Sequence, residues 1–168
     1  KKIWLQVALR YDNAYFHKGW FEANGENVSD FNTYNGKLKN NRWEHLSPRV
    51  ALRYNPTRAI SAYISYSQGF RASILDDFCR SGWMWVGPKI ANPELGPEQI
   101  DNYEIGGTFR LTKNLSFSPS LYYAKGKDFL YYVTTGEKMW GKRDIFQRQN
   151  VSKVDVKGIE ADLNYIPF

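Results

Sequence analysis

The sequence has little of what many proteins use for covalent reinforcement or for catalysis. Its 168 residues include one cysteine, Cys79, and two histidines, His17 and His45. Cys79 therefore has no partner for an internal disulfide. No apolar run approaches the ~18 residues of a membrane-spanning helix, and this excludes a helical membrane protein. A nucleophile elbow, a phosphate-binding loop and metal-ligand spacing are also missing, so we expect no enzyme, no cofactor and no metal site.

The charge pattern argues against nucleic acid as a partner. The net charge is +6 and the mean hydropathy is −0.59. Lysines and arginines are spread along the chain, without a basic helix, a clustered basic face or an aromatic RNA-recognition signature. The length favours one domain. No signal peptide precedes the first apolar segment, and both ends fall at the edge of such segments, so we expect an internal piece of a longer protein.

What the sequence does contain is alternation with a period of two. The connections between the alternating segments are long (12–48, 68–98 and 125–149) or short (55–58 and 112–114). Alternating long and short connections are typical of an antiparallel up-and-down β-barrel that crosses a membrane. The predicted strands are residues 3–11, 49–54, 59–67, 99–110, 115–124 and roughly 150–165.

The two faces of these predicted strands differ in polarity. In the register that contains Leu5, Leu52 and Ile105, none of 25 positions is charged, whereas 13 of the 19 interleaved positions are polar and five are charged. A lysine or arginine at mid-bilayer on the lipid face costs about 2–4 kcal/mol, so the uncharged face is predicted to contact lipid. Aromatic residues at both strand ends predict interfacial rings, formed by Tyr11, Tyr66, Tyr103 and Tyr123 near the long loops and by Tyr54, Phe109 and Tyr165 near the short turns.

Two positions interrupt the pattern. Pro119 lies in the middle of a predicted strand and removes one ladder hydrogen bond, which predicts a bulge. The alternation also slips between Val156 and Ile159, which predicts a second bulge near Lys157 and Gly158.

Three motifs follow one another in the order found in a known family. They are residues 46–54 with 62–72, residues 92–98 (Asn-Pro-Glu-Leu-Gly-Pro-Glu) with 102–106, and residues 149–151 with 156–161. The segment 46–165 resembles the barrel of TonB-dependent outer-membrane receptors. The residues themselves favour structural roles for these motifs, because glycine and proline end strands and shape loops.

The resemblance implies a fold and a function. It implies about six strands of a larger barrel of the 22-strand type, with the plug domain absent from residues 1–168. Such receptors lie in the outer membrane of Gram-negative bacteria and import ferric siderophores, heme or cobalamin with energy supplied through TonB. The expected partners are an iron-siderophore or related complex, the plug of the same receptor, TonB through that plug, and outer-membrane lipid.

Ligand contacts are expected from the loops. Exposed tryptophans can stack on a planar ligand and arginines can neutralise an anionic complex. The proposed contact residues are Arg71, Arg80, Trp83, Trp85 and Lys89. A weaker candidate of the same kind is residues 138–143.

Heme is a narrower alternative within the same family. The resemblance includes two boxes of heme receptors, at residues 70–73 and 92–95, but no histidine lies between them in this sequence. His17 or His45 could serve as an axial ligand, and a solvated loop position is the competing interpretation of each. Siderophore-type complexes are therefore favoured.

Two further classes of protein stay open at this point. One is a passive outer-membrane channel or adhesin barrel, which would need no plug. The other is a soluble β-barrel or sandwich that binds carbohydrate through loop aromatics.

Overall fold

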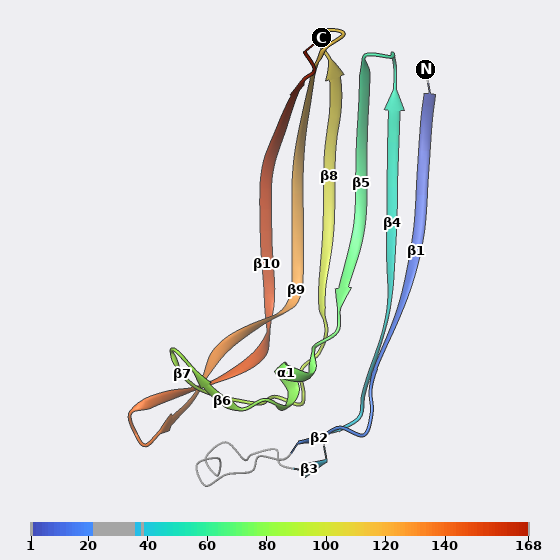
Figure 1. Cartoon of the computed structure of the whole chain (residues 1–168). Coiled ribbons are helices and arrows are strands. Elements are labelled where there is room, and N and C mark those ends of the chain that lie inside the picture. The colour runs from blue at the N-terminus through green and yellow to red at the C-terminus, as the bar shows by residue number, and fades with distance from the viewer. Residues whose placement is uncertain (1, 22–35, 38, 168) are drawn as a thin grey trace.

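The computed structural model describes residues 2–21, 36–37 and 39–167, and β-strands dominate it (Figure 1). Six long strands lie side by side in an open antiparallel sheet in the order β1-β4-β5-β8-β9-β10. Each neighbour in space is thus the next long strand in the sequence, which confirms the predicted up-and-down arrangement. The strands are β1 (Lys2–Phe16), β4 (Asn41–Asn55), β5 (Ile60–Arg71), β8 (Glu98–Arg110), β9 (Leu115–Met139) and β10 (Arg143–Tyr165).

The two ends of the sheet are built differently. Short turns join β4 to β5 and β8 to β9 at the end that also carries both chain termini (Figure 1). In the first turn the Thr57 hydroxyl accepts the backbone N–H groups of Ala59 and Ile60. The opposite end carries the longer connections and their small elements, which are β2 (Trp20–Phe21), β3 (Gly36–Lys37), α1 (Leu75–Cys79), β6 (Gly82–Met84) and β7 (Gly87–Ile90).

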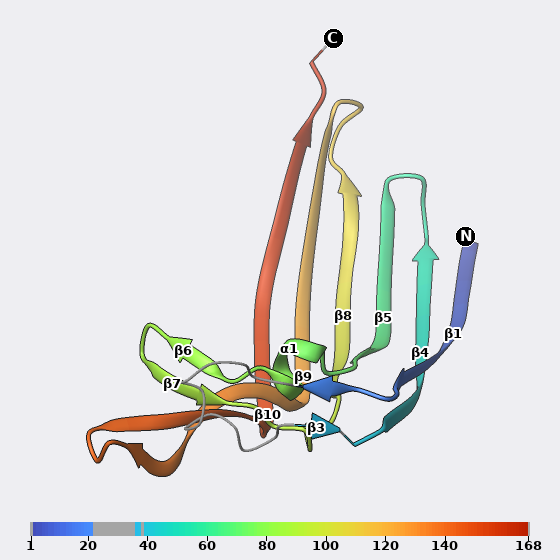
Figure 2. The same cartoon turned by 60° about the horizontal axis from the view of Figure 1, so that its bottom comes forward.

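The small elements extend the sheet beyond its six long strands. β6 pairs with β7, and β7 pairs in parallel with β10 through Lys89 opposite Phe146. The distal parts of β9 and β10 bend sharply away from the other long strands, with β6 and β7 beside them (Figure 2). Among the residues that the structure describes, no helix is long and apolar enough to cross a bilayer.

Five of the long strands, β1, β4, β5, β9 and β10, extend further at the loop end than predicted. β1 and β4 remain paired up to Phe16 opposite Asn41, inside the predicted loop 12–48. The predicted loop 125–149 was also wrong, since these residues form a hairpin that closes at Trp140 and Gly141, both with positive φ. That pair of dihedrals belongs to a type I′ turn. Both extensions were missed because no lipid lies against a strand beyond the bilayer, so its residues need not alternate between apolar and polar.

Neither predicted bulge is present. Ala161 lies opposite Pro119, and Lys157 and Gly158 lie opposite Tyr123 and Tyr122, all in one continuous register of β9 and β10. The register between these two strands shifts instead between Asp144 and Phe146. On its other side β9 keeps the same register with β8 on both sides of Pro119, so the proline interrupts pairing there without adding a residue.

The six long strands form a wall, and their register confirms its two predicted faces. Cross-strand partners connect one apolar row through every long strand, formed by Leu5, Leu52, Ile64, Ile105, Leu121 and Ile159. Leu5, Ile64 and Ile159 are exposed. The adjoining row on the other face holds Gln6, Ala51, Ser65, Glu104 and Tyr122. The wall therefore separates an apolar from a polar environment.

An aromatic row marks the loop-side limit of the apolar face. Tyr66, Tyr103 and Tyr123 are cross-strand neighbours, with ring centroids 5.1 Å and 6.1 Å apart. The Tyr123 hydroxyl donates to Asp155 at 3.0 Å, and the Lys157 ammonium lies 5.3 Å from the Tyr123 ring centroid. The slip in alternation near Lys157 thus marks the place where the outward face becomes polar.

Two glycines on the polar face provide space for tyrosine rings. Gly106 lies opposite Tyr63 and Gly158 opposite Tyr122. A Cβ at Gly106 would come within 2.7 Å of the Tyr63 hydroxyl, and one at Gly158 within 2.3 Å of the Tyr122 ring. The lack of a side chain at these two glycines therefore permits the close packing of the tyrosine rings across the strands.

The buried apolar core lies among the loops. Phe78 of α1, Leu95 and Leu130 form it, with Trp43 and Cys79 packed against them. The Phe78 ring stacks on Trp43 at 5.4 Å and contacts Phe16 at 5.5 Å. Helix α1 thereby joins the loop between β5 and β8 to the ends of β1 and β4.

Candidate functional site

The three sequence motifs meet at the base of the loops. Arg71, the last residue of β5, forms an ion pair through its Nε with the carboxylate of Glu98, the first residue of β8. The other Glu98 oxygen accepts the backbone N–H of Leu130 at 2.7 Å. Glu98 is buried, so these partners satisfy a carboxylate that would be costly to bury alone.

A second set of bonds lies beside the first. The side chain of Asn150 accepts the backbone N–H of Gly96 at 2.8 Å and donates to the carbonyl of the same residue at 3.0 Å. It also donates to the Asp128 carbonyl at 2.7 Å. The Ser73 hydroxyl donates to the Gly96 carbonyl at 2.7 Å, and the Asn92 amide donates to the Arg148 carbonyl at 2.8 Å. The motifs thus fix the loops to one another.

Three of the proposed ligand residues already have anionic partners. Arg71 is paired with Glu98 as above. Arg80 donates to Asp76 at 2.9 Å, and Lys89 donates to the other oxygen of Asp76 at 3.2 Å. Lys89 is buried and its ammonium also lies 5.8 Å from the ring centroid of Tyr132. The structure thus gives Arg71 and Lys89 supporting contacts within the loops, and the side chains of Arg71 and Arg80 both stay exposed.

These charges set the ionisation of the loop. Hydrogen bonding from Arg80, reinforced by Lys89, lowers the pKa of the Asp76 carboxyl below its ordinary 3.8 against the opposing effect of burial. Burial, together with the negative charge of Asp76, raises the pKa of the Cys79 thiol above 9.0. Asp76 is therefore an anion at neutral pH and Cys79 is a neutral thiol.

The two proposed tryptophans lie on the loop surface. Trp83 on β6 faces Trp140 in the β9–β10 turn, with 5.8 Å between ring centroids, and the Arg143 guanidinium lies 5.5 Å from the Trp83 ring centroid. Trp85 is 97% exposed in the turn between β6 and β7. Here the structure brings the weaker candidate segment 138–143 against the stronger one. No spacing in the sequence indicated that contact, because it depends on how two hairpins pack.

Both histidines have partners within the loop region. His45 forms a hydrogen bond with Gln68 at 3.0 Å and stacks on Phe70 at 4.9 Å. His17 forms a hydrogen bond with the Tyr15 hydroxyl at 2.9 Å and stacks on that ring at 5.2 Å. In the described part of the chain, no group of three or more His, Cys, Asp or Glu side chains is arranged to hold a metal ion.

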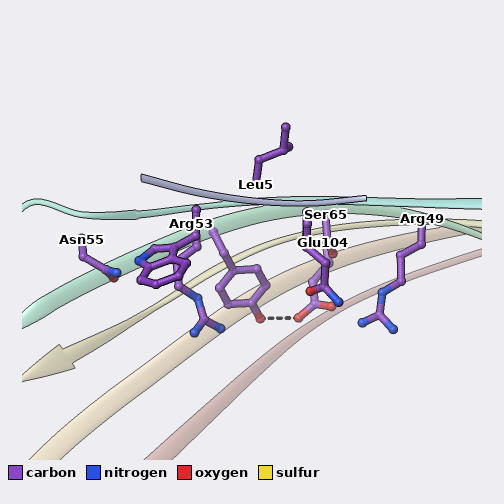
Figure 3. A pocket seen from close by; sticks show the side chains of 10 residues that line it. Leu5, Arg49, Arg53, Asn55, Ser65 and Glu104 are labelled. Carbon is purple, nitrogen blue, oxygen red and sulfur yellow. Dashed lines mark hydrogen bonds between the residues drawn. The ribbon is translucent and has the colours of Figure 1, made fainter. Parts of the chain in front are cut away.

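The polar face of the wall forms an open groove of about 710 Å³ across β1, β4, β5 and β8. Its charged residues are Arg49, Arg53 and Glu104. Figure 3 shows these three side chains on one side of the sheet and Leu5 on the other. Glu104 accepts a hydrogen bond from the Tyr63 hydroxyl, drawn as a dashed line. The groove can hydrogen-bond to a polar partner that fills the concave side.

The sequence that forms this two-faced wall and its loops matches one family model. The model for the TonB-dependent receptor-like β-barrel matches residues 1–166. The chain belongs to this family. The proteins of this family are transport receptors of the outer membrane of Gram-negative bacteria, and the soluble carbohydrate-binding alternative has no support from the match.

Solved structures agree on the fold. A double mutant of the Serratia marcescens hemophore receptor HasR, in complex with hemophore HasA and heme, matches with a TM-score of 0.70 and 16% identity over 98% of this chain and 28% of that one. The copper transporter OprC matches with a TM-score of 0.70 and 17% identity over 100% of this chain and 24% of that one. The siderophore receptor PirA from Pseudomonas aeruginosa matches with a TM-score of 0.62 and 18% identity over 74% of this chain and 26% of that one.

These similarities cover only part of each solved structure. The chain spans about a quarter of the length of each of these three structures. At such identities they show the fold alone, which is a six-stranded part of a larger transmembrane barrel. None of the curated protein sequences matches the chain.

Proposed function

We propose that this chain forms part of the barrel wall and outer loops of an outer-membrane receptor that imports an iron complex. The energy comes through TonB, and a ferric siderophore is preferred to heme. The receptor lies in the outer membrane of a Gram-negative bacterium, with the apolar row of the wall against lipid. Membership of the TonB-dependent receptor barrel family supports the transport class.

One observation carries the choice of an iron complex. Trp83, Trp140 and Arg143 form an exposed group of two indole rings and one guanidinium at the loop end. Indole faces stack on flat aromatic ligands, and the guanidinium favours negative charge. A ferric catecholate complex is both flat at its rings and anionic. Trp85 and Arg80 are also exposed and lie close to Trp83 in the sequence, while Arg71 and Lys89 form ion pairs within the loops.

Heme is the second candidate. HasR, one of the similar structures, was solved with heme. Against it, no histidine lies between the two heme-receptor boxes. His17 and His45 each stack on a neighbouring aromatic ring and use one ring nitrogen in a hydrogen bond, so either would have only its other ring nitrogen to offer as an axial ligand.

The remaining parts of the mechanism lie outside residues 1–168. A plug domain of the same receptor would fill the polar groove lined by Arg49, Arg53 and Glu104, and TonB would act on that plug. A passive channel would need neither.

The test uses the full-length receptor in cells that lack their other iron receptors. Uptake of ⁵⁵Fe is measured with a ferric catecholate, a ferric hydroxamate and heme, with and without a functional TonB gene. We expect uptake of a ferric siderophore that stops when TonB is removed. Uptake that continues without TonB would favour the passive channel, and uptake of heme alone would replace the siderophore.

A further inference from the structure

A basic cluster occupies the outward face just beyond the aromatic row. It consists of Lys125, Lys127, Lys153 and Lys157. Lys125 and Lys127 follow Tyr123 on β9 at spacings of two residues, so they share its face. On β10, Lys157 lies opposite Tyr123 and Lys153 lies opposite Lys127. The cluster therefore continues the lipid-facing side of the wall toward the loop end.

The positive charge of this cluster exceeds the negative charge around it. Two carboxylates, those of Asp101 and Asp155, lie in the same rows, as the partners of Lys125 on its two sides. Asp101 also accepts hydrogen bonds from Tyr66 and Gln68 at 2.9 Å and 2.8 Å, and its Oδ2 is 3.9 Å from the Lys127 ammonium. Within the described residues, Lys125 and Lys153 form no ion pair.

The pairing of Lys127 with Lys153 is unfavourable by itself. Residues directly opposite each other on antiparallel strands have Cβ atoms about 4.5–5.5 Å apart, and like charges at that separation destabilise the pair. A sheet that keeps two lysines opposite each other, with a third two residues away, gains stability from a bound anion with several acceptor oxygens. A phosphate group fits this description, because its oxygens can accept from more than one ammonium group.

The height of the cluster indicates where that phosphate would lie. Each step of two residues along a strand advances about 6.6 Å, or roughly 5 Å along the membrane normal for a strand tilted by about 40°. Lys125 and Lys127 thus lie about 5 Å and 10 Å beyond the tyrosine row. The polar layer on each side of a bilayer is roughly 5–8 Å thick. Lys157 and Lys125 therefore lie at the depth of the lipid headgroups, and Lys127 and Lys153 lie at the outer edge of that layer.

We propose that this cluster is a binding site for the phosphate groups of lipid A in the outer leaflet. Its acyl chains would lie along the apolar face beneath, beside Leu121 and Ile159. Tyr103 and Tyr123 would line the boundary between the chains and the sugar headgroup. This proposal rests on the outer-membrane placement in the proposed function and does not depend on which iron complex is imported.

The experiment measures lipid binding to the purified full-length receptor in detergent by native mass spectrometry. The probes are bisphosphorylated lipid A, the same lipid A without phosphates, and phosphatidylglycerol. The test variant is K125Q/K127Q/K153Q. The matched control, K113Q/K138Q/K142Q, removes the same charge elsewhere. Each lysine near a charged lipid surface contributes a several-fold effect, so we expect affinity for bisphosphorylated lipid A to fall at least about tenfold in the test variant and to change less than about twofold in the control.

Two further arms keep the result interpretable. The variant K125R/K127R/K153R keeps the charge and should retain binding, and heat-modifiable gel mobility checks that every variant forms a barrel. Equal affinity in test and control variants, or equal binding of lipid A with and without phosphates, would overturn the proposal. Tight binding of phosphatidylglycerol would also overturn it, because the cluster would then bind anionic lipids in general. ⁵⁵Fe uptake, measured in parallel, tests the proposed function separately.

Discussion

Asn150 on β10 binds both backbone groups of Gly96, 54 positions earlier in the sequence. Its carboxamide thus offers the loop one acceptor and one donor, as the backbone of a neighbouring strand would. The third bond, to the Asp128 carbonyl, holds β9 at the residue where its φ becomes positive. One side chain therefore fixes the loop before β8 and the bend of β9 together.

Replacing Asn150 with alanine should loosen this junction. The change leaves the Gly96 N–H and the Asp128 carbonyl without this partner, while the Gly96 carbonyl keeps the bond from the Ser73 hydroxyl. A buried group left unsatisfied costs about 1–3 kcal/mol, and less where water can enter. We expect faster hydrogen exchange at residues 92–98 of the full receptor, with the wall strands unchanged. Asn164→Ala, on the polar face near the short turns, is the matched control. Equal protection of residues 92–98 in both variants would contradict this role.

Arginine scanning should separate the faces of the wall. Arginine at Leu52 or Ile105 places a charge on the lipid-facing row and should cost about 2–4 kcal/mol, enough to impair folding into bilayers. Arginine at Ser65 or Ser118 faces the polar side and should be tolerated. The measurement is the folded fraction of the full receptor after transfer into lipid vesicles. If all four variants fold equally well, the two faces are misassigned.

Trp83 and Trp140 should act together in ligand binding. Because their rings are in contact, alanine at both positions removes the proposed stacking surface. We expect ferric siderophore affinity to fall about tenfold or more while barrel formation is unchanged. Tyr15→Ala, which removes an exposed aromatic ring at the end of β1, is the control. Binding that matches the control would remove this pair from the ligand site.

The sequence predicted the wall much better than the loops, for a physical reason. Lipid on one side and polar surroundings on the other impose a period of two, so Leu52 and Ile105 could be assigned to their face directly. Beyond the membrane that constraint ends, and the paired segments 12–16, 41–48 and 125–149 have no such pattern. The slip at Lys157 is the same effect, since the outward face becomes polar there and no residue is inserted.

The charged loop residues show a second limit of prediction from the sequence. Arg71 and Lys89 look like ligand residues in the sequence because they are cationic and near tryptophans. Their partners, Glu98 and Asp76, are 27 and 13 positions away and meet them through the fold. These ion pairs, and the burial of Lys89, separate the two cations from the exposed tryptophans, and both depend on how the chain packs. The motif residues were predicted to be structural, and their hydrogen bonds within the loops agree with that prediction.

Asp76 should make the loop between β5 and β8 sensitive to acid. Its pKa is lowered in the folded loop, chiefly by the hydrogen bond from Arg80 and further by Lys89. The folded state therefore binds the proton less readily than the unfolded loop. The stabilising contribution is complete above the ordinary pKa of 3.8 and disappears as the pH falls through the lower folded value. We expect limited proteolysis of residues 72–97 in the full receptor to be constant from about pH 5 to 8 and to accelerate below about pH 4.

The Asp76→Asn variant should be cleaved faster at pH 7 and should lose most of the acid response. Glu94→Gln, which removes an exposed carboxylate paired with Lys39, is the control and should keep that response. An acid response of the same size in Asp76→Asn would assign the titration to another group. Because Asp76 is partly exposed, salt should weaken the effect, and repeating the assay at 0.5 M salt checks its electrostatic origin.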